Sequence, residues 1–324
     1  MPIWSKKPPT KELFAHFYFR KMKRSIVTQG AATLMISLPS TWARRFRLEK
    51  GKEIDIVEKG RELIVKPEFV SEIKKTKINI SELKHLWRRV VSALYKAGYD
   101  EIEIDFNKPD EITKVYSVLQ EFIGFEIINQ TEKSCLIKEI VESKETNFNA
   151  IFSRTFGMLL SIAEDCSNAL KKRNTELLGT ISERDIIINK YANFCRRIIN
   201  KGLVDQKDAP MLYYLIEELE TMGDVYKDFA TYIFETKNIP NEKVVKSLDE
   251  VNTLIADLSL IISRFGKEKI IDFTERWRKL RDIVDEMFKT KSIAETRALN
   301  YISEILQQLQ NMVGPILTIN AENL

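Results

Sequence analysis

Residues 22–67, which read MKRSIVTQGAATLMISLPSTWARRFRLEKGKEIDIVEKGRELIVKP, decide the fold of the first part of the chain. Apolar and polar residues alternate on both sides of a turn that contains Gly30, and this period of two is typical of half-buried strands. A second alternating pair surrounds a turn that contains Gly60, which predicts a hairpin. The predicted strands are residues 25–27, 34–37, 53–57 and 62–65, and the predicted helix is residues 42–46.

The residues between the two strand pairs predict one short helix. Pro39 has no N–H to donate, so we expect the second strand to end there. Ser40 or Thr41 is predicted to cap the helix that follows, and Gly51 marks its end. Four short strands and one helical turn cannot bury a core alone, so this stretch predicts a module that needs a second copy of itself.

Length and composition predict a multi-domain protein of the cytoplasm. The chain has 324 residues and no run of 18 apolar ones, and its first residues lack the apolar segment of a signal peptide. Cys135, Cys166 and Cys195 are far apart and are expected to be reduced core thiols. With only His16 and His85, a histidine-based metal site or catalytic triad is hard to build.

Charge is distributed unevenly along the chain. Residues 1–70 carry 15 Lys and Arg against 7 Asp and Glu, a net +8, whereas the remaining residues carry 36 against 40, a net −4. A basic module that doubles on dimerisation is the electrostatic footprint of a nucleic-acid binder. The predicted DNA contacts are Lys21, Lys23, Arg24, Arg44, Arg45 and Arg47. The alternative is a solvated charged face on a module that only dimerises.

Residues 71–141 predict a small α+β layer with helices on one face. Strands are expected at 77–80, 100–106, 125–129 and 135–139. A helix over 83–97 would begin at a capping box formed by Asn79 and Glu82 and stop at Gly98. A second helix would open at Pro109.

From about residue 147 the apolar period changes to 3.6 and stays there. Breaks near 178–180, 200–208, 238–241, 266 and 289–292 divide this part into six long helices, which predicts two antiparallel three-helix bundles. The predicted domains are an N-terminal extension at 1–21, the strand module at 22–70, an α+β domain at 71–145 and a helical domain at 146–320.

Several motifs resemble known families. Ser37-Leu38-Pro39, Trp42-Ala43, Leu48 with Gly51, and the strand at 53–57 resemble the AbrB/SpoVT/MazE swapped-hairpin domain, in which two chains interleave into one DNA-binding barrel. The rest of the chain resembles archaeal phosphate-uptake regulators that fuse this module to a PhoU-like helical domain. One departure is the first turn, where Thr28 and the pair Ala31-Ala32 replace the basic residues and glycines of the family.

The PhoU-like resemblance implies a metal site in the helical domain. Glu220 and Asp224 lie one helical turn apart, and Asp185 and Asn189 have the same spacing on the preceding helix. In that family such carboxylates gather divalent or ferric ions. A second motif pairs Asp282, Asp285 and Glu286 with Gln307 and Asn311, whose amides are poor substitutes for carboxylates. The alternative for all these acids is an ordinary polar helix face.

Two functions follow. The first is a homodimeric transcription regulator of phosphate uptake that binds double-stranded DNA and has no enzymatic activity. The second is a PhoU-type adaptor that contacts a phosphate transporter or its sensor kinase, with the strand module only dimerising. The sequence contains neither a nucleophile–base pair nor a glycine-rich phosphate loop, so an enzyme is not expected.

Overall fold

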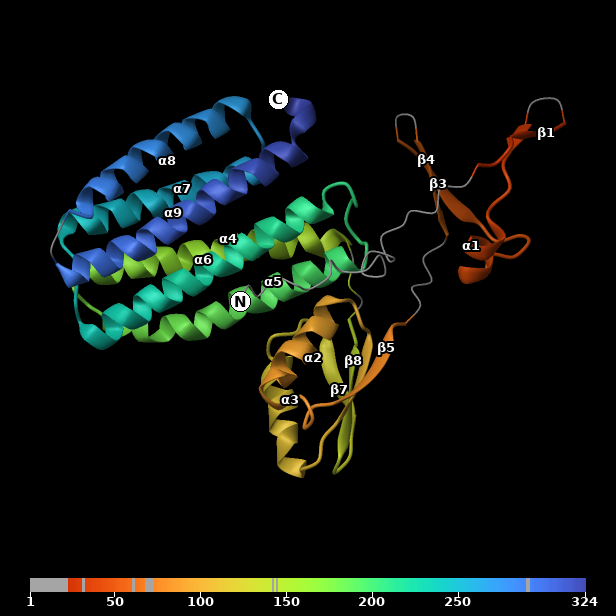
Figure 1. The fold of residues 1–324 in the computed structure, drawn as a ribbon, viewed down its shortest axis with the longest axis horizontal. Helices are drawn as coiled ribbons and strands as arrows, with labels where there is room; N and C mark the ends of the chain where they lie inside the picture. Colours follow the sequence, from red (N-terminus) through yellow and green to blue (C-terminus); the bar gives the residue numbers. More distant parts are fainter. Residues whose placement is uncertain are drawn as a thin grey trace, which may run out of the picture. The chain divides into compact units, whose positions relative to one another are not determined.

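The computed structural model describes residues 23–30, 33–59, 62–67, 73–141, 143, 145–289 and 292–324. The chain forms two compact units, Met1–Glu72 and Ile73–Leu324, each of which is treated by itself (Figure 1). The central sheet and the helices from residue 87 onward fall within the second unit. The predicted four-domain boundaries therefore stay predictions.

The first unit contains two hairpins and one short helix. Strands β1 (Val27–Gln29) and β2 (Thr33–Met35) pair antiparallel, and so do β3 (Ile54–Lys59) and β4 (Glu62–Pro67). The two hairpins form separate two-stranded sheets. This agrees with the predicted order of elements.

The short helix α1 (Ser40–Arg45) differs from its prediction at both ends. Pro39 occupies the N-cap position with an extended backbone, and no side chain caps the helix, so the predicted cap at Ser40 or Thr41 is wrong. Both residues instead lie inside the first turn. Proline can hold this position because its fixed φ suits the residue before a helix and its missing N–H is not needed there.

The central sheet belongs to the second unit. Its strands are β5 (Lys75–Asn79), β6 (Glu101–Asp105), β7 (Phe125–Gln130) and β8 (Ser134–Glu139), in the spatial order β5-β6-β8-β7. β5 and β6 are parallel and the other pairs are antiparallel. Helices α2 (Trp87–Lys96) and α3 (Ile112–Leu119) cover one face, as predicted (Figure 1). Tyr95, Ile102 and Ile137 are fully buried between these layers.

The predicted capping box at the start of the first central helix is wrong. The Asn79 side chain accepts a hydrogen bond from the Ser81 backbone N–H at 3.0 Å, which makes a local turn rather than a helix cap. A 3-10 turn at Lys84–Leu86 follows, and α2 begins only at Trp87. The predicted stop holds, because Gly98 has a φ of 85°.

The remaining described residues form a helical region, as predicted. Its first three long helices are α4 (Glu145–Lys171), α5 (Ile181–Asn200) and α6 (Ala209–Thr236), and the next three are α7 (Glu242–Ser263), α8 (Lys267–Met287) and α9 (Ile293–Ile319). The two sets of three pack on each other chiefly through α6 with α9 and α4 with α7. Their apolar stripes share one core with the central sheet. No helix in the described part of the chain is long and apolar enough to cross a membrane.

Candidate nucleic-acid interface and charged clusters

The predicted DNA-contact residues surround the β1–β2 hairpin and α1. Lys23 and Arg24 immediately precede β1, Arg44 lies on α1 and Arg47 follows it, and all four side chains are exposed. Lys21 lies outside the described residues, and so does the side chain of Arg45. The six residues therefore stay predicted contacts.

The local backbone holds two of these arginines near the end of α1. The Arg44 Nε donates to the Ser40 carbonyl oxygen at 3.4 Å, and Arg47 has a φ of 49°. The turn at Arg47 is closed by a bond from the Leu48 N–H to the Ala43 carbonyl at 2.9 Å. An exposed guanidinium with neighbours of its own sign is available to a phosphate group.

The first unit also exposes many apolar side chains. Leu34 is 68% exposed and Ile26 is 65% exposed, and no side chain described between residues 23 and 67 is buried. Strand alternation places Val27 and Met35 on one face of the β1–β2 hairpin and Leu34 on the other. The β1–β2 hairpin therefore presents apolar side chains on both of its faces, and exposed apolar patches of this kind are typical of interaction surfaces.

The first predicted metal motif is a cluster of ion pairs in the structure. Asp185, on α5, is buried, and its Oδ2 accepts hydrogen bonds from Lys227 Nζ at 2.9 Å and from Asn189 Nδ2 at 3.2 Å. Lys227 also pairs with Asp224, whereas Glu220 turns aside to pair with Arg196. The structure thus brings two of the four predicted residues to the Lys227 ammonium, joins Asn189 to one of them, Asp185, and pairs Glu220 with a different cation.

These residues do not fit a metal centre as they lie. Within the described part of the chain, no three His, Cys, Asp or Glu side chains gather closely enough to hold a metal ion. Asp185 Oδ1 and Asn189 Oδ1 are buried without a hydrogen-bond partner. Two free oxygens are few for a hard cation, which takes six or more oxygen ligands. Burial raises the pKa of Asp185, which the hydrogen bond from Lys227 opposes.

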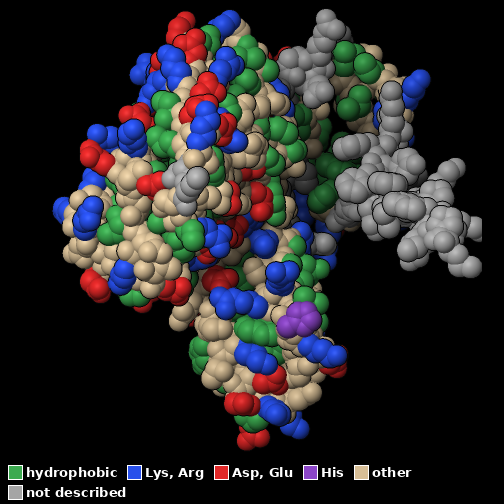
Figure 2. All heavy atoms as spheres, turned by 60° about the vertical axis from the view of Figure 1, so that its left-hand side comes forward, with side chains coloured by type: hydrophobic (Ala, Val, Ile, Leu, Met, Phe, Trp, Pro, Cys, Tyr) green, Lys and Arg blue, Asp and Glu red, His purple; other side chains and the backbone are tan. Residues whose placement is uncertain are grey.

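Four residues of the second predicted motif make contacts with neighbouring side chains. Asp285 pairs with Arg281 at 3.1 Å, and Glu286 pairs with Lys289. Gln307 Nε2 donates to Asn311 Oδ1 at 2.9 Å, and the Asn311 amide reaches Glu218. The face of the helical region that Figure 2 shows mixes both signs of charge.

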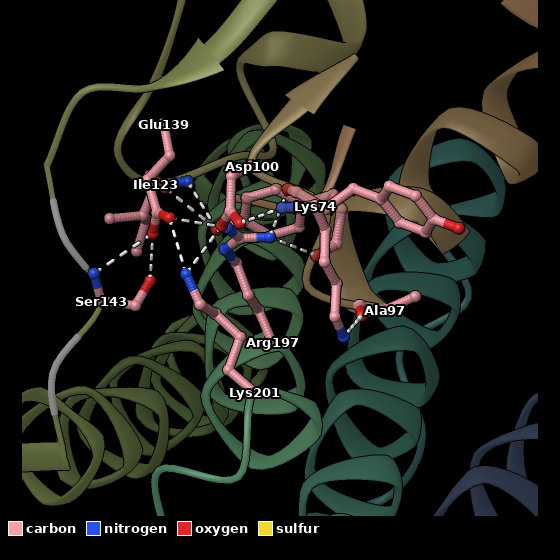
Figure 3. Close-up of polar contacts among 10 residues, drawn as sticks. Lys74, Ala97, Asp100, Ile123, Glu139, Ser143, Arg197 and Lys201 are labelled. Atoms are coloured by element: carbon pink, nitrogen blue, oxygen red, sulfur yellow. Dashed lines mark hydrogen bonds and ion pairs between the residues drawn. The ribbon is translucent and has the colours of Figure 1, made fainter. Parts of the chain in front are cut away.

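A larger charged cluster joins the helices to the central sheet, and the sequence reasoning missed it. Arg197, near the end of α5, is 0% exposed and donates to Asp100 Oδ1 and Glu139 Oε2, both at 2.8 Å (Figure 3). Its other terminal nitrogen donates to the carbonyl oxygens of Tyr95 at 3.0 Å and Tyr99 at 2.7 Å. Lys201, one turn later, contacts the same two carboxylates at 2.7 and 2.8 Å.

Aromatic rings complete the environment of Arg197. Its guanidinium carbon lies 5.2 Å from the ring centre of Tyr95 and 4.9 Å from that of Phe125. Burial opposes ionisation of Glu139, but hydrogen bonds from Arg197, Lys201 and Ser143 together outweigh it and lower its pKa to about 2. The cluster therefore carries two cations and two anions in a shielded site.

The sequence gives only a weak indication of this charged cluster between α5 and the central sheet. Arg197 and Lys201 are four residues apart at the end of α5, a spacing that places them on one face, and the pair Arg196-Arg197 interrupts an apolar run of the helix. Their partners lie about 100 and 60 residues away along the chain. Only the folded chain brings them together.

Residues 27–70 match the family model for MazE, described as an antidote-toxin recognition protein and bacterial antitoxin. The match extends from β1 through β4, and it confirms the resemblance of this stretch to the AbrB/SpoVT/MazE-type module. It covers a small part of the whole chain.

A search of solved structures found the phosphate transport system regulatory protein PhoU from Streptococcus pneumoniae. The two structures have a TM-score of 0.45 and 16% sequence identity, over 53% of this chain and 93% of that one. A search of the curated proteins found no match.

Proposed function

We propose that this protein is a non-enzymatic, DNA-binding transcriptional regulator of phosphate uptake that dimerises through its strand module. The observation that carries the proposal is the combination found in residues 23–67. Apolar side chains are exposed on both faces of the β1–β2 hairpin, and exposed cations lie beside it. The match of the same residues to MazE supports it.

Dimerisation follows from the missing core of the module. A stretch of this size that buries none of its described side chains cannot be stable alone. Pairing with the same surface of a second chain would cover Leu34 and its neighbours without any further partner. We expect the two hairpins of each copy to contribute to that shared core.

DNA is the partner that suits the charge of the dimer. Two copies of residues 1–70 would bring together a net +16, twice the +8 of one chain. Phosphate contacts from Lys23, Arg24, Arg44 and Arg47 would give an affinity that falls with salt. The link to phosphate uptake rests on the resemblance of the sequence to phosphate-uptake regulators.

A second candidate is an adaptor that acts by protein contact, with the module only dimerising. The residues near the first turn favour it, because Thr28 and the pair Ala31-Ala32 offer no cation to a DNA backbone. DNA-binding measurements separate the two candidates.

The test is a double substitution on α1. Arg44→Ala with Arg45→Ala is expected to weaken binding of duplex DNA about tenfold or more, because two charged contacts per chain are lost. The mass of the dimer should not change, which sedimentation checks. Lys50→Ala with Lys52→Ala, in the turn before β3, is the matched control. Its affinity for duplex DNA is expected to stay closer to that of the wild type than the affinity of the Arg44/Arg45 variant does. An unchanged affinity in the Arg44/Arg45 variant would remove these residues from the interface.

A further inference from the structure

A large groove runs along the outer edge of the central sheet. Its volume is about 960 Å³, and every residue from Phe122 to Gln130 lines it. Consecutive residues of a strand point to opposite faces, so a groove that all of them reach lies along the backbone edge rather than over one face. The other lining residues come from α3 and the residue after it, from α4 and from α5: Tyr116, Leu119, Gln120, Ile151, Arg154, Lys190 and Tyr191.

The backbone of β7 presents free hydrogen-bonding groups to this groove. β7 is an edge strand, since the sheet order ends with it. The Ile140 N–H donates to the Gly124 carbonyl at 2.7 Å, so Gly124 and then Glu126 point toward β8. Phe125 and Ile127 alternate with them and direct their N–H and C=O groups outward. In the described part of the chain no strand pairs with this outer edge.

Apolar contact surface lies beside these groups. Ile128 is 52% exposed at an irregularity in the β7–β8 register, and Tyr116, on α3, is 53% exposed. The irregularity shortens the regular edge to the stretch around Phe125 and Ile127. Such a bulge discourages long strand-to-strand association but leaves room for a short segment.

Two cations line the same groove without an ion-pair partner among the described residues. Arg154 is exposed on α4, and Lys190 is half-buried on α5. Several other cations near the central sheet are paired with a carboxylate, namely Lys75, Lys77, Arg88, Lys114 and Lys138. The two cations outnumber the one carboxylate that lines the groove, that of Glu126, so the charge of the groove favours a negatively charged partner.

We propose that this groove binds an acidic, extended peptide segment of a partner protein, which pairs with β7 as an additional strand. The outward groups of Phe125 and Ile127 would bond to the peptide backbone, Ile128 and Tyr116 would contact its apolar side chains, and Arg154 and Lys190 would contact its carboxylates. The proposal concerns the second unit alone and goes beyond DNA binding by the first. A second copy fits less well, because symmetric pairing of β7 with β7 would bring the cations of both copies together.

The test uses the full chain and a fluorescent eight-residue peptide in which Glu alternates with Val or Thr. We expect the peptide to bind, and the backbone amides of Phe125 and Ile127 to exchange hydrogen more slowly in its presence. A peptide with two consecutive N-methylated amides, which blocks both of its edges, and a peptide with Lys in place of Glu are both expected to bind at least tenfold more weakly.

The chain offers a matched pair of variants for the charge contribution. Arg154→Glu with Lys190→Glu is expected to weaken peptide binding at least tenfold, whereas Arg278→Glu with Lys279→Glu, two exposed cations on α8, should leave it unchanged. Circular dichroism of each variant checks that the helices are intact.

Three results would overturn the proposal. The first is an affinity weaker than about 1 mM for the acidic peptide on the wild-type chain. The second is binding that ignores N-methylation or the Arg154 and Lys190 substitutions. The third is a fall in the molecular mass of the assembly in solution when Ile128 is replaced by Asp. That result would show that the edge strand β7 pairs with a second copy of the chain instead.

Discussion

Arg197 is the residue on which the packing of α5 against the central sheet depends. It is completely buried, and it satisfies two carboxylates and two carbonyl oxygens from three segments of the α+β layer. A buried ion pair adds little over apolar packing, but removing one partner leaves the opposite charge stranded. The stability of this cluster should therefore fall when any one of its charged side chains is removed.

Arg197→Met keeps much of the side-chain volume and removes the charge. We expect it to lower the free energy of unfolding by about 3–5 kcal/mol, because Asp100 and Glu139 would then share Lys201 as their remaining cation. Arg184→Met on the same helix is the control. Its pair with Asp165 is partly exposed, so its loss should cost about 1 kcal/mol or less. Denaturant unfolding measures both, and equal losses would contradict a special role for Arg197.

Lys227 is the cation of the first carboxylate cluster. Lys227→Met is expected to destabilise the chain by about 1–3 kcal/mol, since it leaves Asp185 buried without its ammonium partner. Asp185→Asn added to this variant should recover part of the loss. If the double variant is no more stable than Lys227→Met alone, the pair is not the source of the effect.

The same cluster predicts a dependence on pH. Burial raises the pKa of Asp185, and loss of Lys227 would raise it further. An acid whose folded pKa lies above its unfolded value binds protons more tightly when folded, so it favours folding at lower pH. The deficit of Lys227→Met should therefore shrink as the pH falls from about 7 to about 5. A deficit that is constant over this range would contradict this explanation.

Acids at helical spacing were easy to find in the sequence, but their partners were not. Glu220 and Asp224 were placed correctly on one helix, and the spacing of Asp224 and Lys227 was equally readable as an ion pair. Which of two neighbouring cations takes which carboxylate depends on the packing of α5 against α6. This is why the sequence alone could not distinguish the metal motif, or the buried contacts of Arg197, from the charged residues of an ordinary solvent-facing helix surface.

At the scale of elements, the repeat of apolar residues along the sequence determined which helices and strands could be predicted. The six long helices were predicted with their breaks because their apolar stripes repeat over many turns. The strands were predicted by alternation and by the turns between them. The starts of α1 and α2 were not, because Ser40, Thr41 and Asn79 carry capping side chains that make other bonds or none.

The β1–β2 hairpin is the element on which dimerisation should depend. Leu34→Asp is expected to turn the proposed dimer into a monomer, because it places a carboxylate in the exposed surface that a second copy would cover. Leu260→Asp on α7 is the control, since Leu260 is 62% exposed and lies in the other unit. Light scattering measures the mass of both. A Leu34→Asp variant that keeps the dimer mass would place the interface elsewhere.

At the scale of the whole molecule, the two units differ in net charge and in how many side chains they bury. The first unit carries the excess of cations and buries none of its described side chains, whereas the second holds the apolar core and a net negative charge. This division fits one part that binds a polyanion as a dimer and another that supplies stability and further contacts.

The most direct test of DNA binding is the affinity of the full-length chain for fluorescent fragments of its own genome, measured by anisotropy across a series of salt concentrations. A dimer that contacts several phosphates should lose affinity steeply, with a slope of log K against log salt steeper than about −4. It should also prefer a fragment near phosphate-transport genes. Weak binding with a shallow slope and no preferred fragment would contradict the proposed regulator and reduce the strand module to a means of dimerisation.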